Sequence, residues 1–355
     1  MLEHSATAQT VGLDVGDRET HYCILDSDGE ISEEGRFRST RQGLTRRFSG
    51  MERSRVVLEV GCLSPWMSRE LEALGHEVLV ANSYQVGRIY KGQDKTDRKD
   101  AETLARFGRS DPKLLRPLRH RGERAMRDRG LLNAREVLVR SRVQLIKLVR
   151  GVFKTVGARV PSCGSAQFDH KARPALQPSL RAALEPLVDT IQQLTDQIRA
   201  YEQAIETMCA KEYPETELLR AVHGVGALSA LTFVLSIEDP HRFEKSRQVG
   251  SYLGLRPGKQ QSGDNDPQLR INRCGDPQLR RLLVQCANYI LGPFGRDSDL
   301  RRFGLHLIER GGRFARKRAV TAVARKLAVL LHRLWVRGEV YEPLYNACRQ
   351  EPLTA

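Results

Sequence analysis

Two acidic residues, Asp14 and Glu59, interrupt apolar runs that otherwise have the pattern of β-strands. In residues 11–16, apolar side chains alternate with glycine and with Asp14, and this period of two is typical of a strand. Glu59 ends the apolar run at 56–58. A carboxylate in a sheet core costs free energy unless something positive holds it there. The sequence therefore predicts that a positive group meets these two strands.

A second acidic pair, Asp97 and Asp100, lies three residues apart, so the two side chains share one face of a helix. Each acid also has a structural reading, because Asp near a helix start satisfies free amides and because a carboxylate near a strand end can face water. Only a metal readily accounts for all four. Mg²⁺ is the natural ion, since it is held by few carboxylates together with water and phosphate oxygens. We predict one catalytic Mg²⁺ site made of Asp14, Glu59, Asp97 and Asp100.

The chain is basic, with 58 Lys and Arg against 43 Asp and Glu and a formal net charge of +15. The surplus is concentrated in residues 88–154 and 267–337, and Arg greatly outnumbers Lys. Because Arg binds phosphate bidentately, basic tracts around an acidic constellation favour an enzyme that cuts nucleic acid. A solvated Arg-rich surface would have the same composition.

Nothing in the sequence indicates export or membrane insertion. The first ten residues lack the apolar core of a signal peptide, and no apolar stretch approaches the roughly 18 residues that span a bilayer. The seven cysteines are scattered without a C-x-x-C pair, which argues against a disulfide framework and a zinc site. We expect a cytoplasmic protein with no membrane partner.

The first region, residues 1–118, has the element order of a ribonuclease-H-like α/β domain, although many α/β folds share parts of that order. Strands are expected at 9–16, 20–27 and 31–38, with the turn D-S-D-G between the last two. A helix near 41–48, the Glu59 strand, a helix at 65–74 and a strand at 77–81 follow.

The middle region, residues 119–212, has heptad spacing. Leucine or valine recurs every seven residues from Leu131 to Val152, and apolar residues from 184 to 208 alternate spacings of three and four. This pattern predicts a coiled coil, either an intramolecular hairpin or a seam between two chains, and we favour the dimer. A mostly helical domain at 213–345 and a tail at 346–355 follow. The turn H-G-V-G in that domain resembles phosphate-binding helix-hairpin-helix modules but is, taken alone, somewhat more typical of tight packing.

Several motifs together resemble one family. The runs V-G-L-D-V-G-D-R-E-T-H-Y-C-I-L-D, L-E-V-G and K-T-D-R-K-D-A are similar to the N-terminal, RuvC-like domain of DEDD insertion-sequence transposases. Downstream, A-V-H-G-V-G-A-L-S-A-L, F-E-K-S-R-Q-V-G-S-Y-L-G-L-R-P, Q-S-G-D and R-I-N-R-C-G-D-P-Q-L-R-R-L-L-V resemble the C-terminal transposase domain of that family, as does the closing K-R-A-V-T-A-V-A-R-K-L. Each motif is weak alone, but their joint order over nearly the whole chain is specific.

The resemblance implies a recombinase of the insertion sequence 110 group, in which RNA-guided bridge recombinases move their own element. Asp14, Glu59, Asp97 and Asp100 match the family's metal-binding acids, and Ser262 matches the serine that attacks DNA. Double-stranded DNA, a structured guide noncoding RNA encoded beside the gene, and a homo-oligomer (dimer or tetramer) are the expected partners. Nucleic-acid contacts are expected from cations near Ser262 and on the final helix, namely Lys259, Arg270, Arg273, Lys317, Arg325 and Lys326.

Two other functions remain open. A Holliday-junction resolvase-like endonuclease would use the four acids without Ser262, although a small resolvase lacks so long a C-terminal region. A catalytically inactive nucleic-acid-binding scaffold would need neither, and acids at all four positions argue against it. Without the resemblance, Q-S-G-D is ordinary turn composition.

Overall fold

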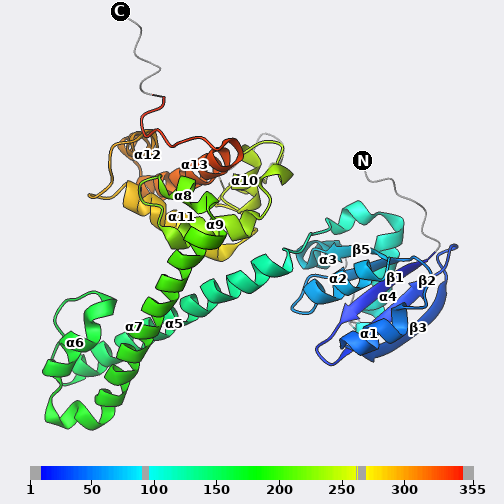
Figure 1. Ribbon diagram of the computed structural model, residues 1–355, viewed down its shortest axis with the longest axis horizontal. Coiled ribbons are helices and arrows are strands. Elements are labelled where there is room, and N and C mark those ends of the chain that lie inside the picture. The colour runs from blue at the N-terminus through cyan, green and yellow to red at the C-terminus, as the bar shows by residue number, and fades with distance from the viewer. Residues whose placement is uncertain (1–8, 90–95, 261, 263–268, 347–355) are drawn as a thin grey trace, which may run out of the picture. The chain divides into compact units, whose positions relative to one another are not determined.

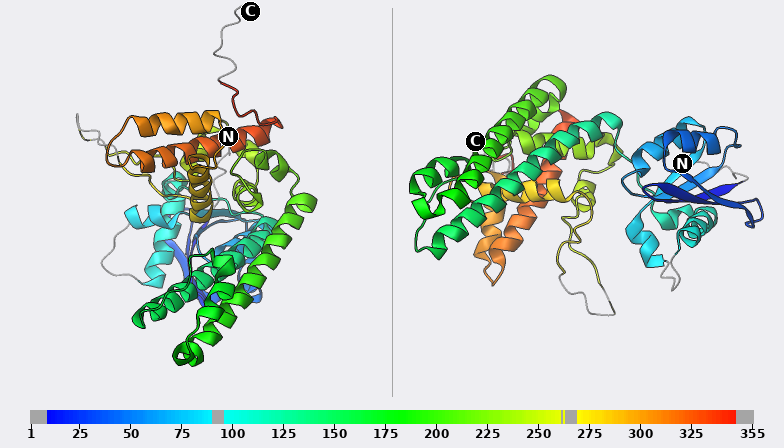
Figure 2. Two further views of the ribbon diagram at one scale, coloured as in Figure 1. Left: turned by 90° about the vertical axis from the view of Figure 1, so that its left-hand side faces the viewer. Right: turned by 90° about the horizontal axis from the view of Figure 1, so that it is seen from below.

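The computed structural model describes residues 9–89, 96–260, 262 and 269–346. The chain divides into two compact units, Met1–Arg121 and Gly122–Ala355 (Figures 1 and 2). The first unit is α/β, and the second is helical. In the described part of the chain, no helix is both long enough and apolar enough to cross a membrane.

The first unit is built on a five-stranded mixed sheet with the strand order β3-β2-β1-β4-β5. The strands are β1 (Thr10–Val15), β2 (Glu19–Leu25), β3 (Ile31–Arg38), β4 (Arg55–Glu59) and β5 (Glu77–Ala81). The first three are antiparallel, and β4 and β5 join parallel to β1. The expected α/β class is confirmed, and the sheet is consistent with a ribonuclease-H-like domain.

Helices cover both faces of this sheet, and the alternation along β1 decides which side chains meet them. They are α1 (Arg41–Phe48), α2 (Ser64–Ala73), α3 (Ser83–Ile89), α4 (Asp97–Ser110) and the short η1 (Pro112–Leu115). Val11 and Leu13 share one core with α1 and α2. Gly12 lies against α4 on the opposite face. Asp14 is two residues further along β1, so it belongs to the face that α4 covers.

The second unit begins with a long helical hairpin. Helix α5 (Glu123–Thr155) and helix α7 (Pro178–Glu212) lie side by side in Figures 1 and 2. Arg142 donates to Thr195 at 3.2 Å, and Arg124 pairs with Glu212 at 3.2 Å, so the two helices run antiparallel. Ile198 of α7 is 2% exposed within the single chain. The heptad stripe is thus buried at this position without a second chain, as in the intramolecular alternative, and dimerisation stays a prediction.

The remaining helices pack at the two ends of this hairpin. They are α6 (Phe168–Ala172), α8 (Glu215–Arg220), α9 (Ala227–Ile237), α10 (Arg247–Tyr252), α11 (Pro277–Ile290), α12 (Asp299–Glu309) and α13 (Ala315–Arg337), with short turns η2 (Ser165–Gln167), η3 (Arg173–Ala175) and η4 (Pro240–Arg242). Helix α6 shares a core with the end of α5 and the start of α7. The helices from α8 onward share another core with the start of α5 and the end of α7. Asp276 caps α11 and pairs at 2.6 Å with Arg129 of α5. The separate regions 119–212 and 213–345 stay a prediction, because both belong to one compact unit.

Candidate active site

Asp14, Glu59 and His21 lie on three adjacent strands of the sheet. Asp14 pairs in register with His21 of β2. On its other side, Leu13 pairs with Leu58 of the parallel strand β4, so Asp14 and Glu59 each occupy the next position. Both carboxylates therefore lie at the carboxyl end of two neighbouring parallel strands, where their side chains are partly exposed.

Helix α4 reaches this end of the sheet because small residues let it approach β1 closely. A Cβ atom on Gly12 would lie 2.0 Å from the carbonyl oxygen of Ala101 and 2.5 Å from the amide nitrogen of Ala105. Near the other end of α4, a Cβ atom on Gly108 would lie 2.2 Å from Cγ2 of Val57. Ala101 of α4 therefore lies against Gly12, and Gly108 lies against the start of the sheet strands, so α4 runs antiparallel to β1. Its first turn, which precedes Ala101, is consequently close to Asp14.

That first turn carries Asp97 and Asp100. The N-cap is Thr96, whose hydroxyl accepts from the amide of Lys99 at 3.3 Å. The capping role that could have explained an Asp here is therefore filled by threonine. The Asp97 side chain is 72% exposed, and its Oδ2 lies 3.8 Å from Nε2 of His21. Asp100 is partly buried.

The electrostatics of Asp14 link the four acids to one another. Its pKa is raised from 3.8 to about 6, first by burial and then by the negative charges of Asp97, Asp100 and Glu59, whereas His21 lowers it. Each carboxylate thus makes ionisation of Asp14 harder, which is the condition that a bound divalent cation would relieve. Within the described residues, no three His, Cys, Asp or Glu side chains are already grouped as ligands of one ion. The acids share a neighbourhood, and their role as metal ligands stays a prediction.

His21 was not identified from the sequence, although a signal for it exists. The short connection between β1 and β2 fixes their register, and in that register the residue opposite Asp14 is His21. An imidazole N–H of His21 can donate a hydrogen bond to a carboxylate, so this residue is placed to orient Asp97.

Ser262 lies in the second unit, beyond a paired stem. Gly258 donates to the carbonyl of Arg270 at 2.9 Å, and Asn272 donates to the carbonyl of Arg256 at 3.0 Å. Ser262 is exposed. Residue 261 and residues 263–268 fall outside the described part of the chain, so no contact of Ser262 with them is assigned.

The base of this stem requires glycine. Gly254 has φ +68°, and a Cβ atom on it would lie 2.1 Å from the carbonyl oxygen of Cys274. Gly275 has φ +78°, and its Cβ atom would lie 2.1 Å from the carbonyl oxygen of Tyr252. Two backbone segments therefore touch directly where the Ser262 stem leaves the helical core.

All six cations expected to bind nucleic acid are exposed. They are Lys259, Arg270 and Arg273 around the stem and Lys317, Arg325 and Lys326 on α13. The H-G-V-G turn, in contrast, serves packing at one point, since a Cβ atom on Gly224 would lie 3.1 Å from the ring of Tyr289 of α11.

Two family models match this chain. One described as "Transposase IS116/IS110/IS902 family" matches residues 216–299, and one described as "Transposase", whose name carries the term DEDD, matches residues 11–157. The chain is 27% identical over 341 residues to the transposase for insertion sequence element IS1111A of Coxiella burnetii, across 93% of this chain and 90% of that protein. It is 29% identical to a probable family 20 transposase of Pseudomonas aeruginosa, across 81% and 86%. It is 27% identical to the pilin gene-inverting protein of Moraxella bovis, across 72% and 71%.

Proposed function

We propose that the chain is a DNA transposase of the IS110 type, and that it cuts and rejoins the DNA of its own insertion sequence with a four-carboxylate metal site and a serine nucleophile. The observation that carries this proposal is the placement of Asp14 and Glu59 at the ends of β1 and β4, with α4 packed against β1 and Asp97 and Asp100 in its first turn. In keeping with this placement, burial and the other three acids raise the pKa of Asp14 to about 6. Four acids that repel one another at the end of a sheet are costly to maintain unless a cation uses them.

Asp14, Glu59, Asp97 and Asp100 would hold the divalent cation. Their oxygen donors suit Mg²⁺, which would stabilise negative charge on a phosphoryl oxygen when bound. The sheet fixes two of the donors and the first turn of α4 fixes the other two. His21 lies 3.8 Å from Asp97 and would orient it by donating a hydrogen bond.

Ser262 would attack the DNA phosphodiester. The bond from its Oγ to phosphorus forms, one phosphorus–oxygen bond of the DNA backbone breaks, and the released oxygen takes a proton in exchange for the one that serine loses. Lys259, Arg270 and Arg273 are exposed around the stem and would hold the phosphate. A serine hydroxyl is a weak nucleophile at neutral pH, so this positive charge assists it.

The partners of this reaction are double-stranded DNA, a structured noncoding RNA that pairs with it, and further copies of the chain. Recombination holds two duplexes together, which calls for a dimer or a tetramer. Where base pairing with RNA selects the site, the protein contacts mainly backbone and shape.

Cleavage of a plasmid that carries the element ends tests the proposal. Asp14→Asn should abolish Mg²⁺-dependent cleavage and leave DNA binding within about threefold, because one neutralised acid hardly changes a surface dominated by cations. Ser262→Ala should abolish the covalent protein–DNA adduct seen after denaturation. Asp28→Asn and Ser162→Ala, both exposed and outside the site, are the matched controls.

Two results would redirect the assignment. Cleavage by Ser262→Ala without an adduct would favour the resolvase-like endonuclease. The same adduct in wild type and Ser262→Ala would exclude this serine as the nucleophile.

A further inference from the structure

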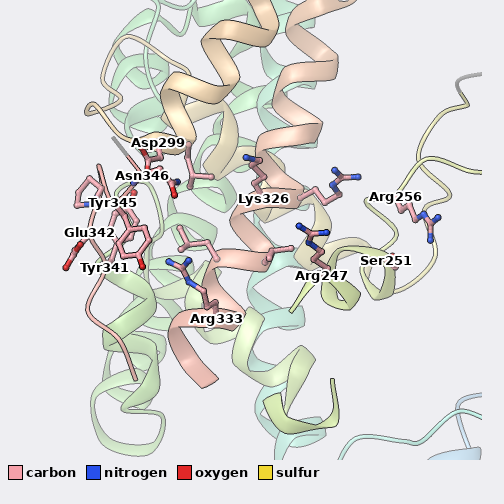
Figure 3. Close-up of a pocket in the computed structure, with 15 residues that line it drawn as sticks. Arg247, Ser251, Arg256, Asp299, Lys326, Arg333, Tyr341, Glu342, Tyr345 and Asn346 are labelled. Carbon is pink, nitrogen blue, oxygen red and sulfur yellow. Dashed lines mark hydrogen bonds between the residues drawn. The ribbon is translucent and has the colours of Figure 1, made fainter. Parts of the chain in front are cut away.

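A cavity of about 830 Å³ lies between α10, α12, α13 and the segment 341–346. We call it the α10–α13 pocket. Five of its lining residues are cationic, namely Arg247, Arg256, Arg325, Lys326 and Arg333. Figure 3 shows Tyr341 and Tyr345 on one side and Arg247, Lys326 and Arg256 on the other. The pocket thus combines a cationic side with an aromatic one.

Packing holds Arg325 and Lys326 in place, and Arg333 pairs with Glu339 at 3.9 Å. A Cβ atom on Gly250 of α10 would lie 2.9 Å from Cγ of Arg325, so this glycine lets the aliphatic stem of Arg325 cross α10. Lys326 lies 3.9 Å from the ring centroid of Phe303 of α12. Among the residues that the structure describes, Arg247, Arg256 and Arg325 form no ion pair.

The aromatic side is anchored to α12. The amide of Asp299 donates to the carbonyl of Pro343 at 2.7 Å, and the amide of Asn346 donates to Oδ2 of Asp299 at 2.8 Å. Arg333 lies 5.4 Å from the ring of Tyr345. Of the two carboxylates that line the pocket, Asp299 is therefore engaged by the segment, and Glu342 is exposed. The five cationic side chains of the pocket therefore outnumber its one remaining carboxylate, Glu342.

Phosphate and a nucleobase are the two chemical groups that this lining recognises. Arg and Lys bind phosphate, and a tyrosine ring stacks on a base of any sequence, as in sites for single-stranded nucleic acid. The volume lies within the range of about 300–1,000 Å³ typical of small-ligand cavities, and a double helix does not enter a cavity of that size.

We propose that the α10–α13 pocket binds one unpaired nucleotide of a nucleic-acid strand, with its phosphate against Arg247 and Arg325 and its base against Tyr345. This inference rests on the proposed function only in that the chain acts on nucleic acid. It adds a site for a nucleotide that has left the duplex, separate from the carboxylates and from Ser262.

The position of Arg256 connects the pocket with the Ser262 stem. Arg256 lines the pocket, and its carbonyl accepts from Asn272 in the stem. Six residues of extended chain span at most about 22 Å. Ser262 consequently lies within that distance of Arg256, one of the residues that line the pocket.

The test is equilibrium binding of fluorescent oligonucleotides to the full-length protein in the absence of divalent cations. The probes are a blunt duplex and the same duplex with one unpaired nucleotide. We expect Arg247→Gln/Arg325→Gln to weaken binding of the second probe about tenfold more than binding of the first, since only the second places a base and phosphate in the pocket. Tyr345→Ala should have the same selective effect, and Tyr345→Phe should restore binding.

The matched control is Arg313→Gln/Arg316→Gln, which removes the same charge from exposed positions outside the pocket. It should weaken both probes equally, as loss of general phosphate attraction does. Equal weakening of both probes by the pocket variants would overturn the proposal. So would full displacement of the strand by a nucleoside monophosphate at the concentration of the oligonucleotide, because the pocket would then be a site for free nucleotides.

Thermal unfolding of each variant separates loss of the pocket from loss of the fold. Since no divalent cation is present and no bond is cut, failure of Ser262 or of the metal site in the cleavage assay leaves this test unaffected.

Discussion

At the scale of single residues, Asp14 makes folding depend on pH. Its pKa is about 6 in the folded chain, against the ordinary value of 3.8 that applies to the unfolded chain. Between these values the folded state keeps a proton that the unfolded state has lost, so stability falls as pH rises. The stability that protonated Asp14 contributes to the folded state is fully present below pH 3.8 and is lost as the pH rises through about 6. Two pKa units correspond to about 3 kcal/mol, which solvent screening of a half-exposed group reduces to about 1 kcal/mol.

Thermal unfolding in a chelator, followed from pH 4 to pH 7, measures this effect. We expect Asp14→Asn to have a flatter profile than wild type and to be the more stable of the two at pH 7. Adding Mg²⁺ at pH 7 should raise the melting temperature of wild type and leave Asp14→Asn nearly unchanged. Parallel profiles for the two proteins would contradict the mutual repulsion of the acids.

At the scale of elements, the approach of α4 to β1 decides whether the acids meet. Gly12→Ala places a methyl group 2.0 Å from the carbonyl of Ala101, so α4 has to move outward. We expect a loss of about 1–3 kcal/mol in the free energy of unfolding by urea, and weaker Mg²⁺ binding by calorimetry. Gly50→Ala is the control, because its Cβ atom would meet nothing within 4 Å. If Gly12→Ala and Gly50→Ala had the same free energy of unfolding, the close contact between β1 and α4 at Gly12 would be disproved.

Local patterns predicted the elements of the first unit, because a strand or a helix start is encoded by a few adjacent residues. The alternation around Asp14 and the spacing of Asp97 and Asp100 are of this kind. The meeting of α4 with Gly12 is different, since it joins segments nearly ninety residues apart, and no periodicity encodes it. The α10–α13 pocket was missed for the same reason, because its cations come from segments that are separated in sequence. Only two of them, Arg325 and Lys326, were singled out, on the final amphipathic helix.

At the scale of the whole molecule, the heptad stripe had two possible partners, and the sequence does not distinguish a helix of the same chain from a helix of another. Both bury the same side chains. Ile198 is 2% exposed within one chain, whereas Val137 of α5 is 57% exposed. This difference supplies a direct test.

We expect Ile198→Asp to lower the free energy of unfolding by about 3 kcal/mol or more, because it buries a charge in the α5–α7 hairpin, and Val137→Asp to change it little. Light scattering reports the oligomer of both variants. A folded monomer of Ile198→Asp with unchanged stability would instead assign this position to a seam between two chains.

The touching backbones at Gly254 and Gly275 have a consequence for how this chain can change over evolutionary time. They close the stem at its root, so the ends of the segment between 259 and 269 are held by contacts that do not involve its length. Loop-closure entropy grows only slowly with length. We therefore expect the helical core to tolerate a change in the length of this segment better than a substitution at Gly254 or Gly275.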